Sequence, residues 1–375
     1  MNIIIIGPAH PLRGGLASYN ERLARAFQQG GHQVSIYTFS LQYPGFLFPG
    51  TTQFSSEPAP SDIDIHVCIN SINPFNWVQT GHKLKKQKPD LVVVRYWLPF
   101  MGPCLGTILR IVKKNKHTKV VCIADNIIPH EKRPGDTLFT KYFVKPIDAF
   151  ITMSEKVLND LSVFKIQQPA KFVPHPLYDN FGEKMSKEVA REKLGLPKDT
   201  FIFLFFGFIR KYKGLDWLIE ATSLLKQKTT KEFKVLIAGE YYEDKTAYEA
   251  HIKALNISDH LILKTDFIAD SEVKYYLCAA DAVVQPYKHA TQSGVTPLAY
   301  HFEIPMIVTR VGALPDMVPH GKVGLVCEPH PASISEAMEQ MLQSGTHHFI
   351  PGLQEEKKKY SWEKMCDVIL NEINK

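Results

Sequence analysis

A run of apolar residues, a glycine-containing turn, a helix and a second apolar run occur in that order twice in this chain. In the first half, IIII (3–6) precedes a glycine turn (7–15), then a stretch with apolar residues at helical spacing, then QVSIYTF (33–39). In the second half, the same order begins at FIFLFFG (201–207) and ends at FKVLIAG (233–239). Strands that are joined through a helix pair in parallel, so the pattern predicts an α/β protein with two doubly wound parallel sheets.

Other apolar runs extend both sheets. Further strands are expected at residues 90–96, 119–124, 148–153, 261–267, 281–287 and 305–310. Residues 174–200 carry prolines and many charges, which predicts a linker with one short helix. We expect an N-terminal domain at 1–175 and a C-terminal domain at 176–359, with an amphipathic helix in 360–375 that packs back on the first. Open parallel sheets bind ligands outside the carboxyl ends of their strands, so the predicted site is a cleft between the domains.

Composition narrows the class of protein. Of 375 residues, 45% are hydrophobic and 22% charged, and no segment approaches the about 18 uninterrupted apolar residues of a membrane helix. The start, MNIIIIGPAHPLRGG, has no basic residue before its apolar run, which is unlike a signal peptide and favours a cytoplasmic protein. Six cysteines form no CxxC pair and show no ligand-like spacing with histidine, so we expect no metal and no other cofactor. A net charge of +6 without a nucleic-acid motif argues against nucleic acid as a partner.

The stretch FFGFIRKYKGLD (205–216) places cations between two glycines at the end of a predicted strand. A helix that begins near Gly214 would direct its first amides toward the ligand, and Arg210 and Lys213 would add full charges. Arginine binds phosphate oxygens in a bidentate fork and lysine supplies a mobile charge, so the pair suits a diphosphate. The alternative is a solvated basic turn, which is our interpretation of Lys211.

A second phosphate cradle is predicted in QPYKHATQSGVTPLAYHFEIP (285–305). Proline is tolerated only in the first helical turn, so Pro297 places a helix start within a residue or two of Gly294. The amides of Gly294, Val295 and Thr296 would then face the ligand, with the hydroxyls of Ser293 and Thr296 as further donors. The alternative is an ordinary capped helix.

The chain resembles the retaining group 1 glycosyltransferases of the GT-B fold, which has two Rossmann-like domains facing across a cleft. Segments that carry the resemblance occur in the family's order: RGGLASYNERLARAF, AREKLGLPKDTFIFLFFGFIRKYKGLDWLIEA, KVLIAGE, YYLCAADAVVQPY, EIPMIVTRVGALPDMV and YSWEKM. The family moves a sugar from a nucleotide-diphosphate donor, here a UDP- or GDP-sugar, to an acceptor. The resemblance assigns the donor to Gly14, Gly15, Arg210, Lys213 and Glu240. The family's arginine usually follows the first glycine, where this chain has a phenylalanine, Phe208, so Arg210 is a displaced substitute.

Two departures from the family concern the chemistry. Two glutamates that contact the donor sugar and ribose are absent, because their positions fall on Ala290 and Leu298. The stretch TQSGV resembles a variant branch in which Gln292 and the neighbouring amides contact sugar and phosphate. Where the family often has a histidine that touches the donor sugar, the best match is Asp125.

Asp125 would hydrogen-bond sugar hydroxyls or stabilise an oxocarbenium-like charge. His130 and Glu131 are close enough in sequence to compete for that role, or else lie on the acceptor side. The alternative for Asp125 is a cap on the following turn.

Basic stretches at 81–89 and 110–119 flank the aromatic RYWLPFMGP (95–103), which contains Trp97. Together they would meet anionic headgroups, which suits an acceptor carried on a lipid and a location at the inner face of the membrane. The alternative is that they are solvated helix faces.

The sequence therefore predicts a retaining, metal-independent glycosyltransferase that acts on a glycan or lipid-linked acceptor. Two rivals stay open: a non-catalytic relative that binds nucleotide or glycan, and a nucleotide-sugar epimerase. A dinucleotide dehydrogenase is disfavoured, since the first loop lacks GxGxxG and no acidic residue ends the second strand.

Overall fold

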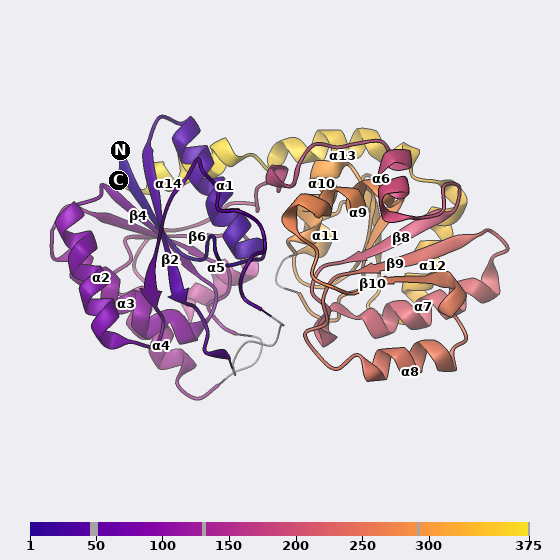
Figure 1. Cartoon of the computed structure of the whole chain (residues 1–375), viewed down its shortest axis with the longest axis horizontal. Coiled ribbons are helices and arrows are strands. Elements are labelled where there is room, and N and C mark those ends of the chain that lie inside the picture. The colour runs from indigo at the N-terminus through magenta and orange to yellow at the C-terminus, as the bar shows by residue number, and fades with distance from the viewer. Residues whose placement is uncertain (46–51, 130–132, 291–292, 374–375) are drawn as a thin grey trace. The chain divides into compact units, whose positions relative to one another are not determined.

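The computed structural model describes residues 1–45, 52–129, 133–290 and 293–373. The chain forms two compact units (Figure 1), one made of residues 1–176 and 361–375 and the other of residues 177–360. Each unit is built around one sheet whose neighbouring strands pair in parallel. The predicted fold class, two Rossmann-like parallel-sheet domains, is confirmed.

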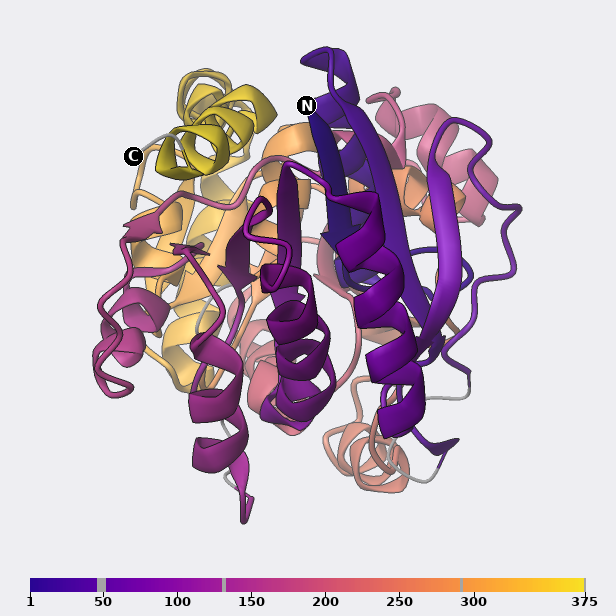
Figure 2. The same cartoon turned by 90° about the vertical axis from the view of Figure 1, so that its left-hand side faces the viewer.

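In the part of the chain that the structure describes, the sheet of the first unit has the strand order β3-β2-β1-β4-β5-β6-β7. Its strands are β1 (Asn2–Ile6), β2 (Gln33–Leu41), β3 (Asp64–Asn70), β4 (Leu91–Tyr96), β5 (Lys119–Ala124), β6 (Ala149–Thr152) and β7 (Ala170–Phe172). Its helices are α1 (Gly15–Gln29), α2 (Pro74–Gln87), α3 (Gly102–Lys113), α4 (Asp136–Val144), α5 (Glu155–Ser162) and α14 (Trp362–Ile373). Helices α2, α3 and α4 pack side by side (Figure 2), whereas α14 packs against α1, β5 and β6.

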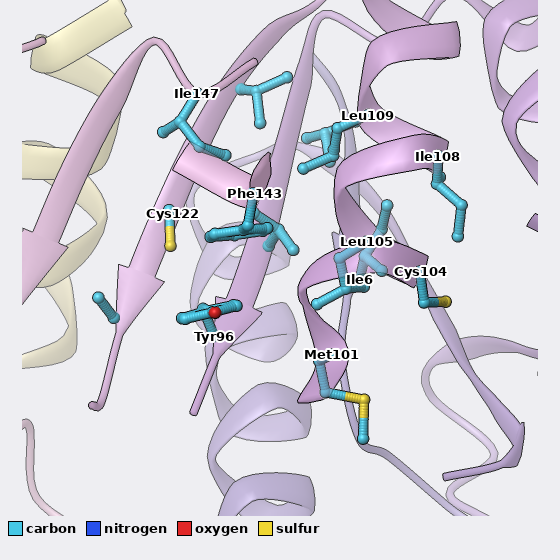
Figure 3. Packing of buried hydrophobic residues seen from close by; sticks show 14 of the residues in the cluster. Ile6, Tyr96, Met101, Cys104, Leu105, Ile108, Leu109, Cys122, Phe143 and Ile147 are labelled. Carbon is cyan, nitrogen blue, oxygen red and sulfur yellow. The ribbon is translucent and has the colours of Figure 1, made fainter. Parts of the chain in front are cut away.

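The first unit's core lies between the sheet and α3 and α4 (Figure 3). Tyr96 at the end of β4 stacks on Phe143 of α4 with ring centroids 4.0 Å apart, and its hydroxyl hydrogen-bonds with the Thr140 hydroxyl at 3.0 Å. Alternate residues of the central strands, such as Ile6 and Cys122, contribute side chains to the same cluster. This packing fixes the carboxyl ends of β1, β4 and β5.

In the second unit, the described strands have the order β10-β9-β8-β11-β12-β13. They are β8 (Phe201–Phe206), β9 (Phe233–Ala238), β10 (Leu261–Lys264), β11 (Ala282–Gln285), β12 (Met306–Thr309) and β13 (Gly324–Cys327). The helices are α6 (Lys187–Leu194), α7 (Leu215–Lys228), α8 (Thr246–Ala254), α9 (Val273–Ala279), α10 (Val295–Phe302), α11 (Leu314–Met317), α12 (Pro331–Ser344) and α13 (Ile350–Glu356). Helices α7 and α12 pack against each other.

The strands that the sequence predicts are all present, and the helix expected to begin near Gly214 is α7, which begins at Leu215. Three strands were missed. In β3, polar and charged residues interrupt the apolar pattern, and Ile69 is the one buried residue among its seven. Strands β7 and β13 are only three and four residues long, too short for a periodicity to emerge. Among the described residues, no helix has both the length and the apolar character to cross a membrane.

Candidate functional site in the second unit

The second sheet has its topological switch point between β8 and β11. From β8 the chain proceeds outward to β9 and β10, and then returns to β11 on the other side of β8. Connections that leave in opposite directions open a crevice at the carboxyl ends of the two central strands. The loop that follows β8 (207–214) and the described residues that follow β11 (286–290 and 293–294) therefore border the place where an open parallel sheet binds ligands.

Two glycines let the loops after β8 and β9 touch through their backbones. A Cβ atom on Gly239 would lie 2.3 Å from the carbonyl oxygen of Gly207, so no larger residue fits there. The contact continues along the chain, because Ile209 donates its amide to the carbonyl of Glu240 at 2.8 Å and accepts from the Tyr242 amide at 3.0 Å. The basic loop is thus fixed to the neighbouring strand end.

Gly214 makes the corresponding contact on the other side. Its φ of 68° lies in the left-handed region, and a Cβ there would lie 1.9 Å from the carbonyl oxygen of Pro286. The glycine ends the short 3₁₀ turn Lys211–Lys213 and directly precedes α7, whose first amides have no intrahelical acceptor. The two glycines that bracket the cations therefore hold the loop against both neighbouring strand ends.

Lys213 is the cation at the centre of this arrangement. Its Nζ lies 3.2 Å from the point where a Cβ on Gly207 would stand, and 5.7 Å from the ring centroid of Tyr287. Burial, and secondly the positive charge of Arg210, lower the pKa of Lys213 to about 8. No carboxylate of the described residues pairs with Lys213. A partly buried cation in such surroundings is stabilised by binding an anion.

Three other cations lie in or near the loop that follows β8, and they have different interaction partners. Arg210 is exposed, with its guanidinium carbon 5.0 Å from the ring centroid of Tyr242, and it forms no ion pair within the described ranges. Lys211 is exposed, as expected for a solvated side chain. Lys288, which the sequence did not single out, pairs with Asp216 and lies over the Trp217 ring. Arg210 and Lys213 are therefore the cations available to a ligand in this loop.

The start of α10 approaches the same point. A Cβ on Gly207 would lie 3.9 Å from Cγ2 of Val295, the first residue of α10, and Gly294 is the N-cap, where the sequence placed the helix start. The side chains differ from expectation, however. The Ser293 hydroxyl accepts the Val295 amide at 3.1 Å, and the Thr296 hydroxyl is hydrogen-bonded to the Gln285 side chain.

Three groups that we expected to bind a ligand are therefore already hydrogen-bonded within the protein. They are the Ser293 hydroxyl, the Val295 amide and the Thr296 hydroxyl. Ser293 acts as the alternative predicted, an ordinary cap that orients the helix start. Gln292 lies outside the described residues.

Glu240 is buried beside this loop and presents its backbone carbonyl to Ile209. At the two positions of the family's glutamates, Leu298 is buried in α10 and Ala290 is half-buried. Within the described ranges, no three His, Cys, Asp or Glu side chains lie close enough together to hold a metal ion.

The first unit places its glycine turn at its own switch point, between β1 and β4. Gly14 has a φ of 99° and caps α1, with its carbonyl accepting the amides of Ala17 and Ser18. Gly15 begins the helix and is exposed. The turn and helix start match the sequence-based expectation.

Asp125, the predicted catalytic group, is paired with a buried arginine of the neighbouring strand. Arg95 holds both of its carboxylate oxygens, with Nε donating to Oδ2 at 2.5 Å and Nη2 to Oδ1 at 2.6 Å, and both side chains are buried. Burial raises the pKa of Asp125, and the Arg95 charge opposes that rise. Arg95 also lies over the Tyr19 ring, 3.9 Å from its centroid. The missed signal was an arginine inside the otherwise apolar strand LVVVRY.

The predicted acceptor-side residues of the first unit are Trp97, His130 and Glu131. Trp97 is half-buried against the core and donates its indole N–H to the Tyr43 hydroxyl at 2.5 Å. His130 and Glu131 lie outside the described residues. The aromatic stretch 95–103 packs mainly into the core and is not the exposed face that we expected.

Comparisons with known proteins agree with this fold. The model of glycosyl transferases group 1 matches residues 186–360, and the model of glycosyltransferase family 4 matches residues 13–177. D-inositol 3-phosphate glycosyltransferase from Pseudarthrobacter chlorophenolicus is 30% identical over 145 residues, which cover 38% of this chain and 34% of that protein. The protein of that name from Thermobifida fusca is 27% identical over 399 residues, covering 95% of this chain and 87% of its own.

Solved structures show the same fold at low sequence identity. Sucrose-phosphate synthase from Thermosynechococcus elongatus has a TM-score of 0.76 at 16% identity, and the match covers 99% of each chain. Anabaena Alr3699/HepE in complex with UDP-glucose has a TM-score of 0.71 at 13% identity, covering 99% of this chain and 100% of that one.

Proposed function

We propose that this chain is a group 1 glycosyltransferase of GT-B fold, and that it transfers a sugar from a nucleotide-diphosphate donor to a glycan or lipid-linked acceptor with retention of configuration. The family models that match its two halves support this proposal. The observation that carries the proposal is Lys213, a partly buried cation without a carboxylate partner among the described residues, at the switch point of the second sheet. Anabaena HepE, which shares the fold, was crystallised with UDP-glucose, and this supports a nucleotide-sugar as the donor.

The proposed mechanism is mainly electrostatic. As the bond between sugar and diphosphate breaks, negative charge grows on the leaving group. In this proposal, Lys213, Arg210 and the first amides of α7 stabilise that charge without a metal ion. We also propose Gly14 and Gly15 as residues that contact the donor.

A pair of lysine variants tests this role. Removing one preorganised donor costs about 3 kcal/mol of transition-state stabilisation, or roughly a hundredfold in turnover. Lys213→Ala should therefore lower sugar transfer by that order, whereas Lys211→Ala, two residues away and exposed, should leave it unchanged. Equal activity of the two variants in a transfer assay would remove Lys213 from the mechanism.

The donor is identified by a thermal-shift panel of UDP-, GDP- and ADP-sugars, since a ligand that binds only the folded state raises the melting temperature. The two rival functions predict different products. A non-catalytic relative, favoured by the missing glutamates at Ala290 and Leu298, would bind a nucleotide without turnover. An epimerase would convert the donor without any acceptor.

A lipid-linked acceptor has separate support in the first unit. Phe75 and Val78 in the first turns of α2 and Ile72 just before the helix are exposed apolar side chains, and Phe75 is 88% exposed. The last turn of the helix carries Lys85 and Lys86. An exposed apolar group with lysines on the same helix favours an anionic membrane surface, which corresponds to the predicted inner-face location.

Vesicle binding tests the membrane contact. We expect the protein to sediment with vesicles that contain phosphatidylserine more than with neutral vesicles, and Phe75→Ser to weaken that binding. Leu263→Ser is the matched control, because Leu263 is also an exposed apolar residue but belongs to the second unit. Equal binding of all three proteins would argue against α2 as the contact.

A further inference from the structure

The amine of Lys213 has surroundings that favour a reactive lysine. Its Nζ lies beside the backbone of Gly207 and 5.7 Å from the ring centroid of Tyr287, and no carboxylate of the described residues pairs with it. The charge that acts on it is that of Arg210, which has the same sign. Lys213 is nevertheless only half-buried, so a small molecule can reach the amine. A lysine that is desolvated and next to a second cation is of the kind that acts as a nucleophile.

These surroundings leave much of Lys213 uncharged in mildly alkaline solution. Because its pKa is lowered to about 8, about half of the side chain is a neutral amine at about pH 8, against less than about 1% of a lysine with the ordinary value of 10.5. A weaker base is also a weaker nucleophile, which offsets part of this gain and leaves a net advantage of about tenfold over a solvated lysine. The proposed transfer mechanism uses the charge of Lys213 and makes no use of this nucleophilic form.

Arg210 places a permanent cation next to that amine. A guanidinium stays charged throughout the physiological pH range, and Arg210 forms no ion pair with any described residue. The Lys213 amide donates to the Arg210 carbonyl at 2.8 Å, so both side chains extend from one turn of the loop. A small molecule whose phosphate is held by Arg210 would therefore bring the group attached to that phosphate close to the Lys213 amine.

We propose that Lys213 is a modification site that is acylated by small acyl phosphates, such as acetyl phosphate. The inference rests on the proposed function, in which the same two cations hold the donor diphosphate. Arg210 binds the phosphate, and the neutral amine of Lys213 attacks the acyl carbonyl carbon. An amide N–C bond forms and the bond between the acyl carbon and the phosphate oxygen breaks. The phosphate leaves with that electron pair and takes up the proton that the amine loses.

Acylation would regulate the site by removing a charge. The nitrogen of an acylated lysine is a neutral amide, so Lys213 would no longer stabilise the leaving diphosphate. A bound nucleoside diphosphate has the opposite effect, because it occupies Arg210 and favours the protonated, unreactive form of Lys213. The protein would therefore be inactivated by acyl phosphate mainly when its donor is scarce.

Acetylation rates of individual lysines, measured by mass spectrometry of peptides, test this assignment. Full-length protein is incubated with acetyl phosphate, and Lys211, which is exposed and two residues away, is the internal control. Lys213 should react more than about tenfold faster than Lys211, because phosphate binding adds to the advantage of the amine itself. Inorganic pyrophosphate, UDP or GDP should suppress acetylation of Lys213 and not of Lys211, and loss of sugar transfer should follow the fraction of acetylated Lys213.

Acetic anhydride separates phosphate recognition from mere reactivity, since it acylates amines without carrying a phosphate. The ratio of Lys213 to Lys211 acetylation should be smaller with acetic anhydride than with acetyl phosphate. In an Arg210→Gln protein with an unchanged melting temperature, the two reagents should give the same ratio.

Two results would overturn the assignment. One is equal acetylation of Lys213 and Lys211 by acetyl phosphate, and the other is a preference for Lys213 that is as large with acetic anhydride. Failure of the proposed function is recognised separately. Wild-type protein that transfers sugar but shows either result loses only the modification site, whereas Lys213→Ala protein with wild-type transfer loses the role of Lys213 in catalysis, whatever the acetylation rates.

Discussion

Lys213 is surrounded by glycine backbone and a tyrosine ring, and this environment makes its charge depend on pH near neutrality. Its pKa is lowered to about 8, so the unliganded protein loses this positive charge as pH rises through that value. A diphosphate binds the protonated form, and its terminal phosphate is already ionised above about pH 7. Affinity for a nucleoside diphosphate should therefore fall by about tenfold between pH 7.5 and pH 9.

Titration calorimetry across that range measures the effect. Lys213→Arg is the control, because a guanidinium remains charged throughout and its affinity profile should be flat. A wild-type profile that is as flat as that of the arginine variant would show that Lys213 does not bind the anion.

Because Asp125 pairs with the buried Arg95, we expect substitution of Asp125 to lower the stability of the protein. The sequence alone had predicted that it would lower catalysis. Asp125→Asn removes the carboxylate charge that faces the buried Arg95 guanidinium, and breaking such a buried pair costs about 3–5 kcal/mol of unfolding free energy. Urea unfolding should show that loss. The double variant Arg95→Met/Asp125→Leu should recover most of it, because neither charge then remains. A stable Asp125→Asn protein that no longer transfers sugar would restore the catalytic interpretation.

Gly195 and Gly214 have nearly the same backbone conformation but different surroundings. Alanine variants at these two positions therefore distinguish the cost of a left-handed backbone from the cost of a steric clash. Gly195 and Gly214 have φ of 67° and 68°, but a Cβ on Gly195 meets nothing within 4 Å whereas one on Gly214 meets the Pro286 carbonyl. Gly195→Ala should cost about 1–2 kcal/mol from the left-handed backbone alone. Gly214→Ala should cost about 2 kcal/mol more, and should also weaken nucleotide binding, since Pro286 or the basic loop must move.

Chemical unfolding of the two alanine variants gives the difference directly. Equal losses for both would mean that the contact between the loop and Pro286 carries no strain. A Gly214→Ala protein that is destabilised but binds nucleotide normally would mean that the cations do not depend on the loop's attachment.

The same elements explain how far the sequence predicts the structure. Strands β4, β5 and β8 are buried along almost their whole length, so each shows as a continuous apolar run. Gly214 and Pro297 mark helix starts because few backbone conformations accept them. By contrast, the partner of Asp125 lies 30 residues away on the neighbouring strand, and the Ser293 hydroxyl binds an amide of its own turn. Side-chain partners depend on three-dimensional packing, which a linear pattern does not contain.

At the scale of the whole molecule, the chain enters the first unit twice, because the end of the sequence returns to complete it. Helix α14 packs against α1, β5 and β6, and buries Trp362, Met365, Cys366 and Ile369. The Trp362 ring lies 4.9 Å from that of Tyr19, and Arg22 lies over it at 5.1 Å. Arg210 and Lys213, the cations proposed to bind the diphosphate, in contrast belong to the second unit.

Truncation after Tyr360 should therefore separate stability of the first unit from nucleotide binding. Each large buried apolar side chain that is removed forfeits about 1.5–3 kcal/mol, so losing Trp362, Met365 and Ile369 forfeits much of the 5–15 kcal/mol typical of a domain. Hydrogen exchange should show faster exchange in peptides from α1, β5 and β6, while calorimetry should find UDP or GDP affinity within about threefold of wild type and transfer should be lost. Unchanged exchange in those peptides would mean that α14 is dispensable for the first unit. If the truncated protein loses both nucleotide binding and the hydrogen-exchange protection of α1, β5 and β6, then nucleotide binding by the second unit depends on the first unit.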